Sequence, residues 1–240
     1  MAWICQKCKG VIEKAVDGGL DFGHFMGCPV VDEWFAKGGR IPVVIGDPAK
    51  EVASSGEEDQ SLTWEYIPGY FDFADVYADA VKEAKPGAHF VEVGCYYGRS
   101  VAYLATRARD AGKPIRIDAV DSFKHPYFRA KAKTFKLFMK HCGFSDVVNL
   151  IELDQLAAAK LYADASLDFV FLDADHTYEA MRAGILAFLP KMKPGGVLAG
   201  DDYTLDFPGV VQAVSELLPG KEIKGRSFRF RLPLVDASLR

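Results

Sequence analysis

Short hydrophobic runs alternate with amphipathic segments from about residue 63 to residue 240. Compact apolar runs between turn residues are typical of buried strands, and apolar residues three and four positions apart predict helices. We therefore expect strands at residues 89–94, 115–120, 147–153, 167–172, 196–199, 221–224 and 227–232. Helices are predicted at residues 99–110, 131–140, 156–162 and 178–190, and the sequence Lys-Pro-Gly-Gly at residues 193–196 predicts a turn into the next strand.

Strands that alternate with helices indicate an α/β fold, in which helices cover both faces of a parallel sheet. Residues 167–172 are apolar nearly throughout, as in a central strand. Residues 227–232 alternate strictly in polarity, so we expect them to pair antiparallel with residues 221–224 at one edge. The expected fold is Rossmann-like: a doubly wound, mostly parallel sheet of seven strands with an antiparallel edge hairpin.

The chain before this region has a different composition. Residues 1–39 hold three of the five cysteines and several glycines, which predicts a small Cys-containing module. Residues 40–62 include a polar run of Ser, Gly and Glu that is typical of an exposed linker. We therefore expect an N-terminal module at 1–39, a linker at 40–62 and the α/β domain at 63–240.

Composition and charge exclude some classes of partner. The 240 residues carry a net charge of −4, which offers no broad basic surface for nucleic acid or anionic lipid. The apolar runs are too short to cross a membrane, and Cys5 and Lys7 interrupt the place where a secretory leader has its apolar core. The odd number of cysteines fits a reducing, cytoplasmic location better than a disulfide framework.

Four candidate zinc ligands lie near the N-terminus: Cys5, Cys8, His24 and Cys28. Their spacing could close on one structural Zn²⁺, which would supply folding energy to a segment with few apolar residues. A dithiol redox pair and unliganded cysteines are the alternatives.

A glycine-containing turn follows the first strand of the α/β domain, in the sequence EVGCYYGRS from Glu92 to Ser100. It is not a dinucleotide fingerprint, because Tyr96 and Arg99 occupy the second and third glycine positions counted from Gly94. The chain also lacks a G-x-x-x-x-G-K-[ST] string. The sequence therefore disfavours a phosphate-bearing cofactor.

An acidic residue ends the second strand of this domain. Asp121 lies 23 residues beyond Gly98, near the spacing at which a carboxylate reaches ribose hydroxyls. A turn or helix cap beside Ser122 is the alternative for Asp121.

A second group of acids follows two later strands, with Asp173 after one and Asp201-Asp202 after the other. Adjacent parallel strands lie about 4.8 Å apart, so carboxylates that leave them at one edge come close together. Their hard oxygen ligands favour Mg²⁺ or a similar ion. The alternative is an acid that holds a substrate or completes a turn.

His176 lies three residues beyond Asp173. If Asp175 caps the following helix, His176 falls in the first turn, where the positive helix end favours the neutral imidazole. A neutral imidazole can accept a proton. A histidine that merely packs against Tyr203 is the alternative.

The motif E-x-G-x-x-x-G, the acid after the second strand and the segment LDFVFLDADHTYEAMRAGILAFLPKMKPGGVLAGDDY together resemble class I S-adenosylmethionine-dependent methyltransferases over about residues 88–203. Within that superfamily, EVGCYYGRS is similar to the catechol O-methyltransferase type. The later segment is similar to the related sugar and macrolide O-methyltransferases, which are metal-dependent.

The resemblance implies roles for individual residues. Glu92, Gly94 and Tyr96 would surround the methionine part of the cofactor, with Ser100 on its carboxylate. Asp154 and Gln155 would reach the adenine, although Asp154 could instead cap the next helix. The full cofactor set is Glu92, Gly94, Tyr96, Gly98, Ser100, Asp121, Ser122, Asp154, Gln155 and Asp173. The implied Mg²⁺ ligands are Asp173, Asp201 and Asp202, and the implied general base is His176.

Five aromatic residues precede the first strand of this domain: Trp64, Tyr66, Tyr70, Phe71 and Phe73. We expect them to pack as core, which is the commoner position of such residues. A lid over the acceptor pocket is the alternative.

The expected function is methyl transfer from S-adenosylmethionine to a hydroxyl of a small molecule, with Asp173 and His176 as catalytic residues. No nucleic acid or membrane partner is expected, and the sequence leaves homo-oligomer formation open. One alternative is a nucleic-acid methyltransferase, but DADH stands where a [DN]-P-P-[YF] motif would follow the strand at 167–172. The other is a catalytically silent protein that keeps the cofactor fold.

Overall fold

The computed structural model describes residues 3–4, 11–12, 63–124 and 132–234. The chain divides into two compact units, Met1–Asp59 and Gln60–Arg240. In the first unit, β1 (Trp3–Ile4) pairs antiparallel with β2 (Val11–Ile12). The four predicted zinc ligands and the predicted linker at 40–62 lie outside the described residues, so the division at 39 and 62 stays a prediction.

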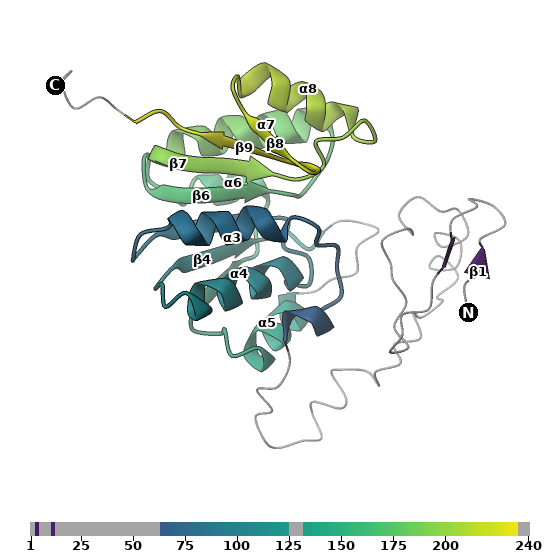
Figure 1. Cartoon of the computed structure of the whole chain (residues 1–240), viewed down its shortest axis with the longest axis vertical. Helices are drawn as coiled ribbons and strands as arrows, with labels where there is room; N and C mark the ends of the chain where they lie inside the picture. Colours follow the sequence, from purple (N-terminus) through teal and green to yellow (C-terminus); the bar gives the residue numbers. More distant parts are fainter. Residues whose placement is uncertain (1–2, 5–10, 13–62, 125–131, 235–240) are drawn as a thin grey trace. The chain divides into compact units, whose positions relative to one another are not determined.

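The second unit is built on a seven-stranded sheet with the order β5-β4-β3-β6-β7-β9-β8 (Figure 1). The strands from β5 to β7 are parallel, β9 is antiparallel to β7, and β8 forms the edge beside β9. This confirms the predicted fold, with β6 at the centre of the sheet. The strands are β3 (His89–Val93), β4 (Arg116–Val120), β5 (Val148–Ile151), β6 (Leu167–Leu172), β7 (Met192–Gly200), β8 (Glu222–Lys224) and β9 (Ser227–Arg231).

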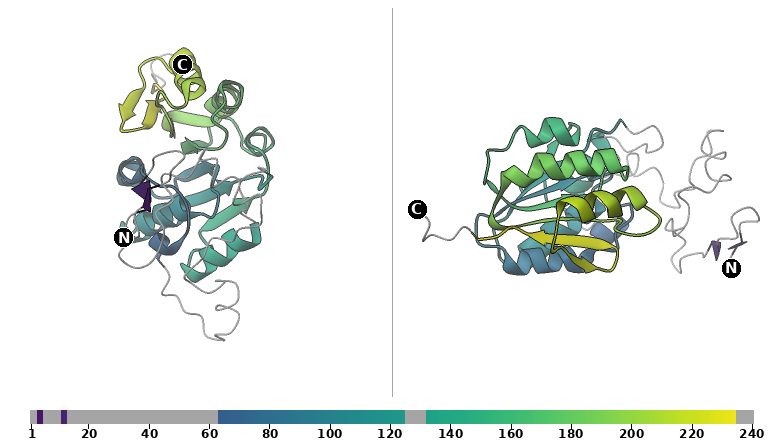
Figure 2. Two further views of the ribbon diagram at one scale, coloured as in Figure 1. Left: turned by 90° about the vertical axis from the view of Figure 1, so that its right-hand side faces the viewer. Right: turned by 90° about the horizontal axis from the view of Figure 1, so that it is seen from above.

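Helices cover both faces of the sheet (Figure 2). One core contains buried side chains of α3 (Ala74–Glu83), α4 (Arg99–Asp110) and α5 (Ala132–His141). The other contains side chains of α6 (Gln155–Ala159), α7 (Tyr178–Phe188) and α8 (Pro208–Leu217). Two short 3₁₀ helices, η1 (Trp64–Tyr66) and η2 (Leu189–Lys191), complete the described elements. No helix in the described ranges is long and apolar enough to cross a membrane.

Three elements differ from the sequence prediction, and one of them is helix α3, which has no counterpart among the predicted helices. Helix α8 was not predicted, although Pro208 stands in its first turn and Val210, Ala213 and Val214 form its buried face. Strand β7 begins at Met192, so the Lys-Pro-Gly-Gly sequence lies within a strand and not in a turn. The pairing of β6 with β7 shifts register in this part, and an irregular strand segment accommodates Pro and Gly.

The aromatic residues before α3 are divided between core and surface. Phe73 is buried and lies 4.4 Å from Phe171 of β6 between ring centroids, while Trp64 and Phe71 pack against the same core. Tyr66 and Tyr70 are 56% and 45% exposed. The expectation of core packing therefore holds for Trp64, Phe71 and Phe73, but not for the two exposed tyrosines.

Gly94 permits the closest backbone approach at the carboxyl edge of the sheet. It has a φ of +95°, and a Cβ atom there would lie 1.9 Å from the carbonyl oxygen of Asp173. A side chain at position 94 would therefore push the end of β6 away from the turn after β3.

We expect Gly94→Ala to destabilise the protein by about 2 kcal/mol or more beyond the cost of Gly87→Ala. Both glycines have positive φ, but a Cβ at Gly87 would meet nothing within 4 Å. The difference between the two variants therefore isolates the clash with Asp173. Urea denaturation of both variants measures it, and equal stabilities would contradict this account of Gly94.

Candidate active site

The topology brings four strand ends to one edge of the sheet. Val93 of β3 is in register with Val120 of β4 and Leu172 of β6, and Leu172 is in register with Gly200 of β7. The next residue of each strand therefore leaves the sheet at the same level, and these residues are Gly94, Asp121, Asp173 and Asp201. Ligands of open parallel sheets bind beyond this edge.

Glu92 is an interior carboxyl group, only 1% exposed. It accepts hydrogen bonds from the Tyr77 hydroxyl at 2.7 Å and from the Ser100 hydroxyl at 2.5 Å. Burial raises the pKa of Glu92 to about 8; the two hydrogen bonds lower it, and the charges of Asp173 and Asp121 add to the rise. The Ser100 hydroxyl, which the resemblance assigns to the cofactor carboxylate, is therefore donated to Glu92 in this structure.

Asp121 organises the turn after β3. Its Oδ2 accepts a hydrogen bond from the backbone N–H of Tyr96 at 2.9 Å, and its Oδ1 accepts one from Phe123 at 2.7 Å. The neighbouring Ser122 hydroxyl accepts a hydrogen bond from the backbone N–H of Lys124 at 3.4 Å. Two backbone donors thus orient a half-buried carboxylate at the carboxyl edge of the sheet.

Gly98 and the two predicted adenine contacts have structural roles. A Cβ on Gly98, whose φ is +92°, would lie 2.6 Å from the ring of Phe135 in α5. Asp154 caps α6 by accepting hydrogen bonds from the backbone N–H groups of Leu156 and Ala157. Gln155 donates a hydrogen bond to the Ala180 carbonyl in α7 at 2.9 Å. The helix-cap alternative for Asp154 is thus present in the structure.

His176 lies between two carboxylates. Its Nε2 is 3.0 Å from Oδ2 of Asp202 and 3.4 Å from Oδ1 of Asp173. The ligand atoms of Asp173, His176 and Asp202 all lie within 4.8 Å of one another. Asp201, the other acid expected at this site, accepts a hydrogen bond from the Ser227 hydroxyl at 3.0 Å.

The helix after His176 begins later than expected. Thr177, and not Asp175, caps α7, because its side chain accepts the hydrogen bond from Ala180. His176 therefore precedes the helix, and its ring packs against Phe207, with 4.7 Å between ring centroids, not against Tyr203 as the alternative had it.

The crowding of charges shifts the pKa values of this group. Burial raises the pKa of Asp173 to about 6, against the effect of His176 and together with the charges of Asp202 and Asp72. Burial also raises the pKa of Asp201 to about 7, and the charge of Asp173 adds to this rise. For His176 burial lowers the pKa, but the neighbouring acids outweigh it and the net shift is upward. The expectation that the helix end keeps His176 neutral was therefore wrong in direction.

Three residues of this region were not predicted from the sequence. Tyr77 of α3 donates to Glu92, the charge of Asp72 acts on both Asp173 and Asp201, and Arg226 forms an ion pair with Asp202 at 2.5 Å. All three come from other parts of the chain than the acids on which they act. The strict alternation at 227–232 was a signal for the hairpin beside Arg226, but not for its contact with Asp202.

The sequence model of the family described as "Methyltransferase domain" matches residues 91–203, which include Glu92, Asp121, Asp173 and Asp202. This match supports the resemblance to class I S-adenosylmethionine-dependent methyltransferases that the motifs carry. No curated protein sequence matches the chain.

Solved structures share the fold of this methyltransferase domain at low sequence identity. Cofactor-bound Rv0187 from MTB is 19% identical, with a TM-score of 0.53 over 86% of this chain and 98% of that one. The O-methyltransferase NovP is 16% identical, with a TM-score of 0.53 over 67% of this chain and 79% of that one. An S-adenosylmethionine-dependent O-methyltransferase from Thermotoga maritima is 16% identical, with a TM-score of 0.50 over 71% and 68%.

The residues of this site fit both S-adenosylmethionine, which the family resemblance implies, and a divalent cation, which the acidic residues imply. Asp121 offers an oriented carboxylate for ribose hydroxyls, and the nearby acids favour a sulfonium cation. Asp173 and Asp202 offer hard oxygen ligands, and the nitrogen of His176 lies beside them. This donor set suits Mg²⁺ or Mn²⁺.

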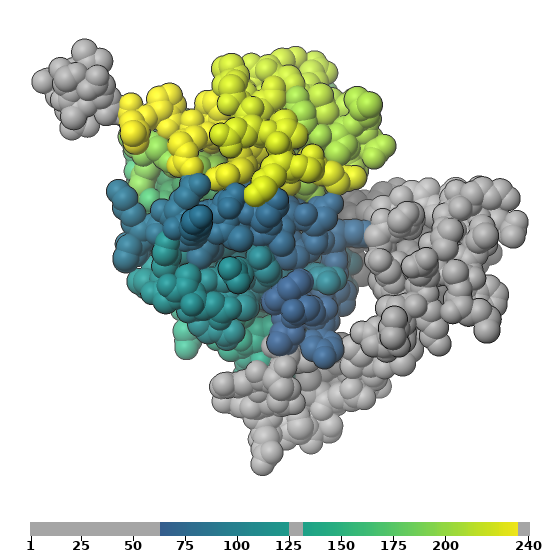
Figure 3. Space-filling view, viewed as in Figure 1, coloured from purple at the N-terminus to yellow at the C-terminus, as the bar shows by residue number. Residues whose placement is uncertain are grey.

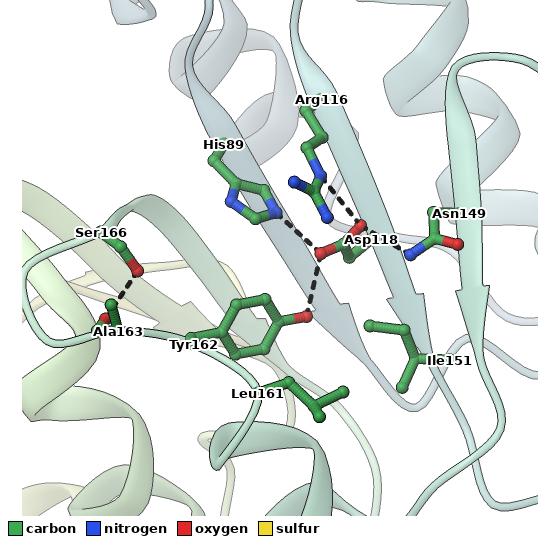
Figure 4. A pocket seen from close by; sticks show the side chains of 9 residues that line it. All are labelled: His89, Arg116, Asp118, Asn149, Ile151, Leu161, Tyr162, Ala163 and Ser166. Atoms are coloured by element: carbon green, nitrogen blue, oxygen red, sulfur yellow. Dashed lines mark hydrogen bonds and ion pairs between the residues drawn. The ribbon is translucent and has the colours of Figure 1, made fainter.

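A pocket of about 320 Å³ lies toward the amino ends of β3 and β4, away from this site (Figure 4). At its base, the fully buried Asp118 accepts hydrogen bonds from Tyr162 and Asn149, contacts His89 at 2.7 Å and lies 3.5 Å from the Nε of Arg116. Burial raises the pKa of Asp118, but these partners together hold it below its usual value. Since every carboxylate oxygen of Asp118 has protein partners, this cluster is structural.

We expect Glu92→Gln to flatten the pH dependence of stability. The unfolded chain loses this proton near the ordinary value of 4.5, whereas the folded protein keeps it to about 8. Between these values the folded state binds more protons, so the free energy of unfolding falls as pH rises, by up to about 1.4 kcal/mol per pH unit. Glutamine is isosteric with the protonated acid and does not titrate.

Urea denaturation between pH 5 and pH 8 measures this dependence. Glu152→Gln is the control, because Glu152 is an exposed acid that pairs with Lys136 at the surface. If the free energy of unfolding of Glu92→Gln falls with pH as steeply as that of the wild type, the raised pKa of Glu92 does not cause this dependence.

Proposed function

We propose that this protein transfers a methyl group from S-adenosylmethionine to a hydroxyl of a small molecule, with a divalent cation, Mg²⁺ by preference, and His176 as general base. The observation that carries the proposal is the group of Asp173, His176 and Asp202, whose ligand atoms lie within 4.8 Å of one another. Two carboxylates and a basic nitrogen at the sheet edge match what activation of a hydroxyl requires.

The chain's own residues would divide the task. Asp121, fixed by two backbone donors, would hold the ribose hydroxyls, and Glu92 would keep Ser100 and the turn after β3 in place. Asp173 and Asp202 would hold the cation, which supplies polarisation of the acceptor hydroxyl when bound. His176 would then accept the hydroxyl proton at Nε2.

The raised pKa of His176 has a place in this scheme. Without a cation the two carboxylates favour the imidazolium form, which cannot accept a proton. Positive charge held by Asp173 and Asp202 would offset that effect and return the imidazole to its neutral form. His176 would therefore be able to accept a proton when the cation is bound, and would be protonated already when the cation is absent.

The acceptor is proposed to be a small molecule and not a nucleic acid. The net charge of −4 gives no basic surface for a phosphate backbone. The residues after β6 are Asp-Ala-Asp-His and not an amino-methylation motif. Sugar, polyketide and catechol hydroxyls are the acceptor classes to test. A homo-oligomer, and a structural Zn²⁺ on the four N-terminal ligands, stay predictions.

We expect His176→Gln to lower the rate of methyl transfer by about 100-fold or more, because general-base catalysis contributes at least that much. Asp202→Asn should lower it as well and should remove the stimulation by Mg²⁺. Both variants should bind S-adenosylhomocysteine like the wild type, because neither residue belongs to the proposed cofactor contacts. Radiolabel transfer to a panel of the three acceptor classes, with and without EDTA, measures the rate, and calorimetry measures the binding.

Asp164→Asn is the matched control, since this exposed acid pairs with Lys191 at 2.6 Å and has no part in the proposed chemistry. If EDTA leaves the wild-type rate of methyl transfer unchanged and Asp202→Asn has the same rate, the proposed role of the cation is wrong. A His176→Gln variant with the wild-type rate of methyl transfer would contradict the role of His176 as general base.

A further inference from the structure

Arg226 joins the edge hairpin to the acidic group of the candidate site. Its guanidinium lies 2.5 Å from Oδ1 of Asp202 and 3.7 Å from Oδ2 of Asp72. Its carbonyl oxygen accepts a hydrogen bond from the backbone N–H of Tyr203 at 2.7 Å. The turn between β8 and β9 is thus bound to the segment after β7 through both side chain and backbone.

The hairpin itself is bound to α3 by charge. Lys224 of β8 lies 2.8 Å from Asp79 and 3.2 Å from Asp75, and Arg229 of β9 pairs with Asp79 at 3.4 Å. Figure 3 shows the hairpin residues (yellow) directly beside α3 (blue) on the surface. The hairpin that carries Arg226 is therefore bound to the rest of the domain from a second side.

Arg226 and His176 occupy different oxygens of the same carboxylate. Asp202 is 7% exposed, so its charge has little access to water and needs partners. Oδ1 contacts Arg226, while Oδ2 lies 3.0 Å from Nε2 of His176. The oxygen beside His176 is therefore the one that Arg226 leaves for the proposed cation.

We propose that Arg226 is a resident counter-cation of the acidic group: it positions Asp202 and weakens the binding of the divalent cation there. This inference rests on the proposed function, because it concerns the same carboxylates. A fixed positive charge stabilises the crowded acids when no ion is bound. The same charge repels a divalent cation held by the neighbouring oxygen, so the ion can exchange.

The test compares three variants of the full chain. Arg226→Met removes the charge, Arg226→Lys keeps it, and Lys224→Met removes a hairpin ion pair that does not involve Asp202. Isothermal titration with MgCl₂ or MnCl₂ gives the ion affinity, and thermal unfolding with and without the ion gives stability.

We expect Arg226→Met to bind the divalent ion about fivefold more tightly or better. Its melting temperature should be below that of the wild type without the ion and should rise more when the ion is added. Arg226→Lys and Lys224→Met should keep ion affinities close to that of the wild type.

An Arg226→Met protein whose ion affinity equals or falls below that of the wild type would overturn the inference, as would the absence of ion binding in both proteins. Failure of the proposed function gives a different result. A wild type that binds the ion but methylates no acceptor would contradict methyl transfer to those acceptors and leave the role of Arg226 standing.

Discussion

The structure depends on keeping several carboxyl groups close together at the carboxyl edge of the sheet. Register places Asp121, Asp173 and Asp201 at one level beside Glu92. Three acids of this edge accept hydrogen bonds from side chains of other segments: Glu92 from Tyr77 and Ser100, Asp201 from Ser227, and Asp202 from Arg226. Without these partners the electrostatic repulsion would favour separation of the strand ends or uptake of protons.

Helix α3 connects the two parts of this arrangement. Through the fully buried Tyr77 it contacts Glu92 of β3, beside the turn that follows this strand. Through Asp75 and Asp79 it holds the hairpin that carries Arg226. A single helix therefore links the part of the candidate site proposed for the cofactor with the part proposed for the cation. Its buried tyrosine contacts the first part, and its exposed acids hold the hairpin of the second.

Much of the fold could be predicted from the sequence, because short apolar runs between turn residues, such as residues 167–172, are typical of buried strands. The strand ends could be predicted for the same reason, so Asp121, Asp173 and Asp202 were found as candidates. Contacts between elements that are distant in sequence could not be predicted in this way. No local pattern shows that Tyr77 donates to Glu92 or that Arg226 pairs with Asp202. The upward pKa shift of His176 likewise comes from the carboxylates that the fold places around it, Asp173 and Asp202 above all.

The backbone conformation of Asp202 limits which residues can replace it during evolution. Asp202 has a φ of +61°, a conformation that Asp, Asn and Gly adopt more readily than other residues. Asparagine would keep both this conformation and an oxygen that accepts from Arg226, while removing the negative charge. Descendants of this domain could thus lose the proposed cation site by one substitution and still fold, so the residue at this position would separate copies that keep that site from copies that lack it.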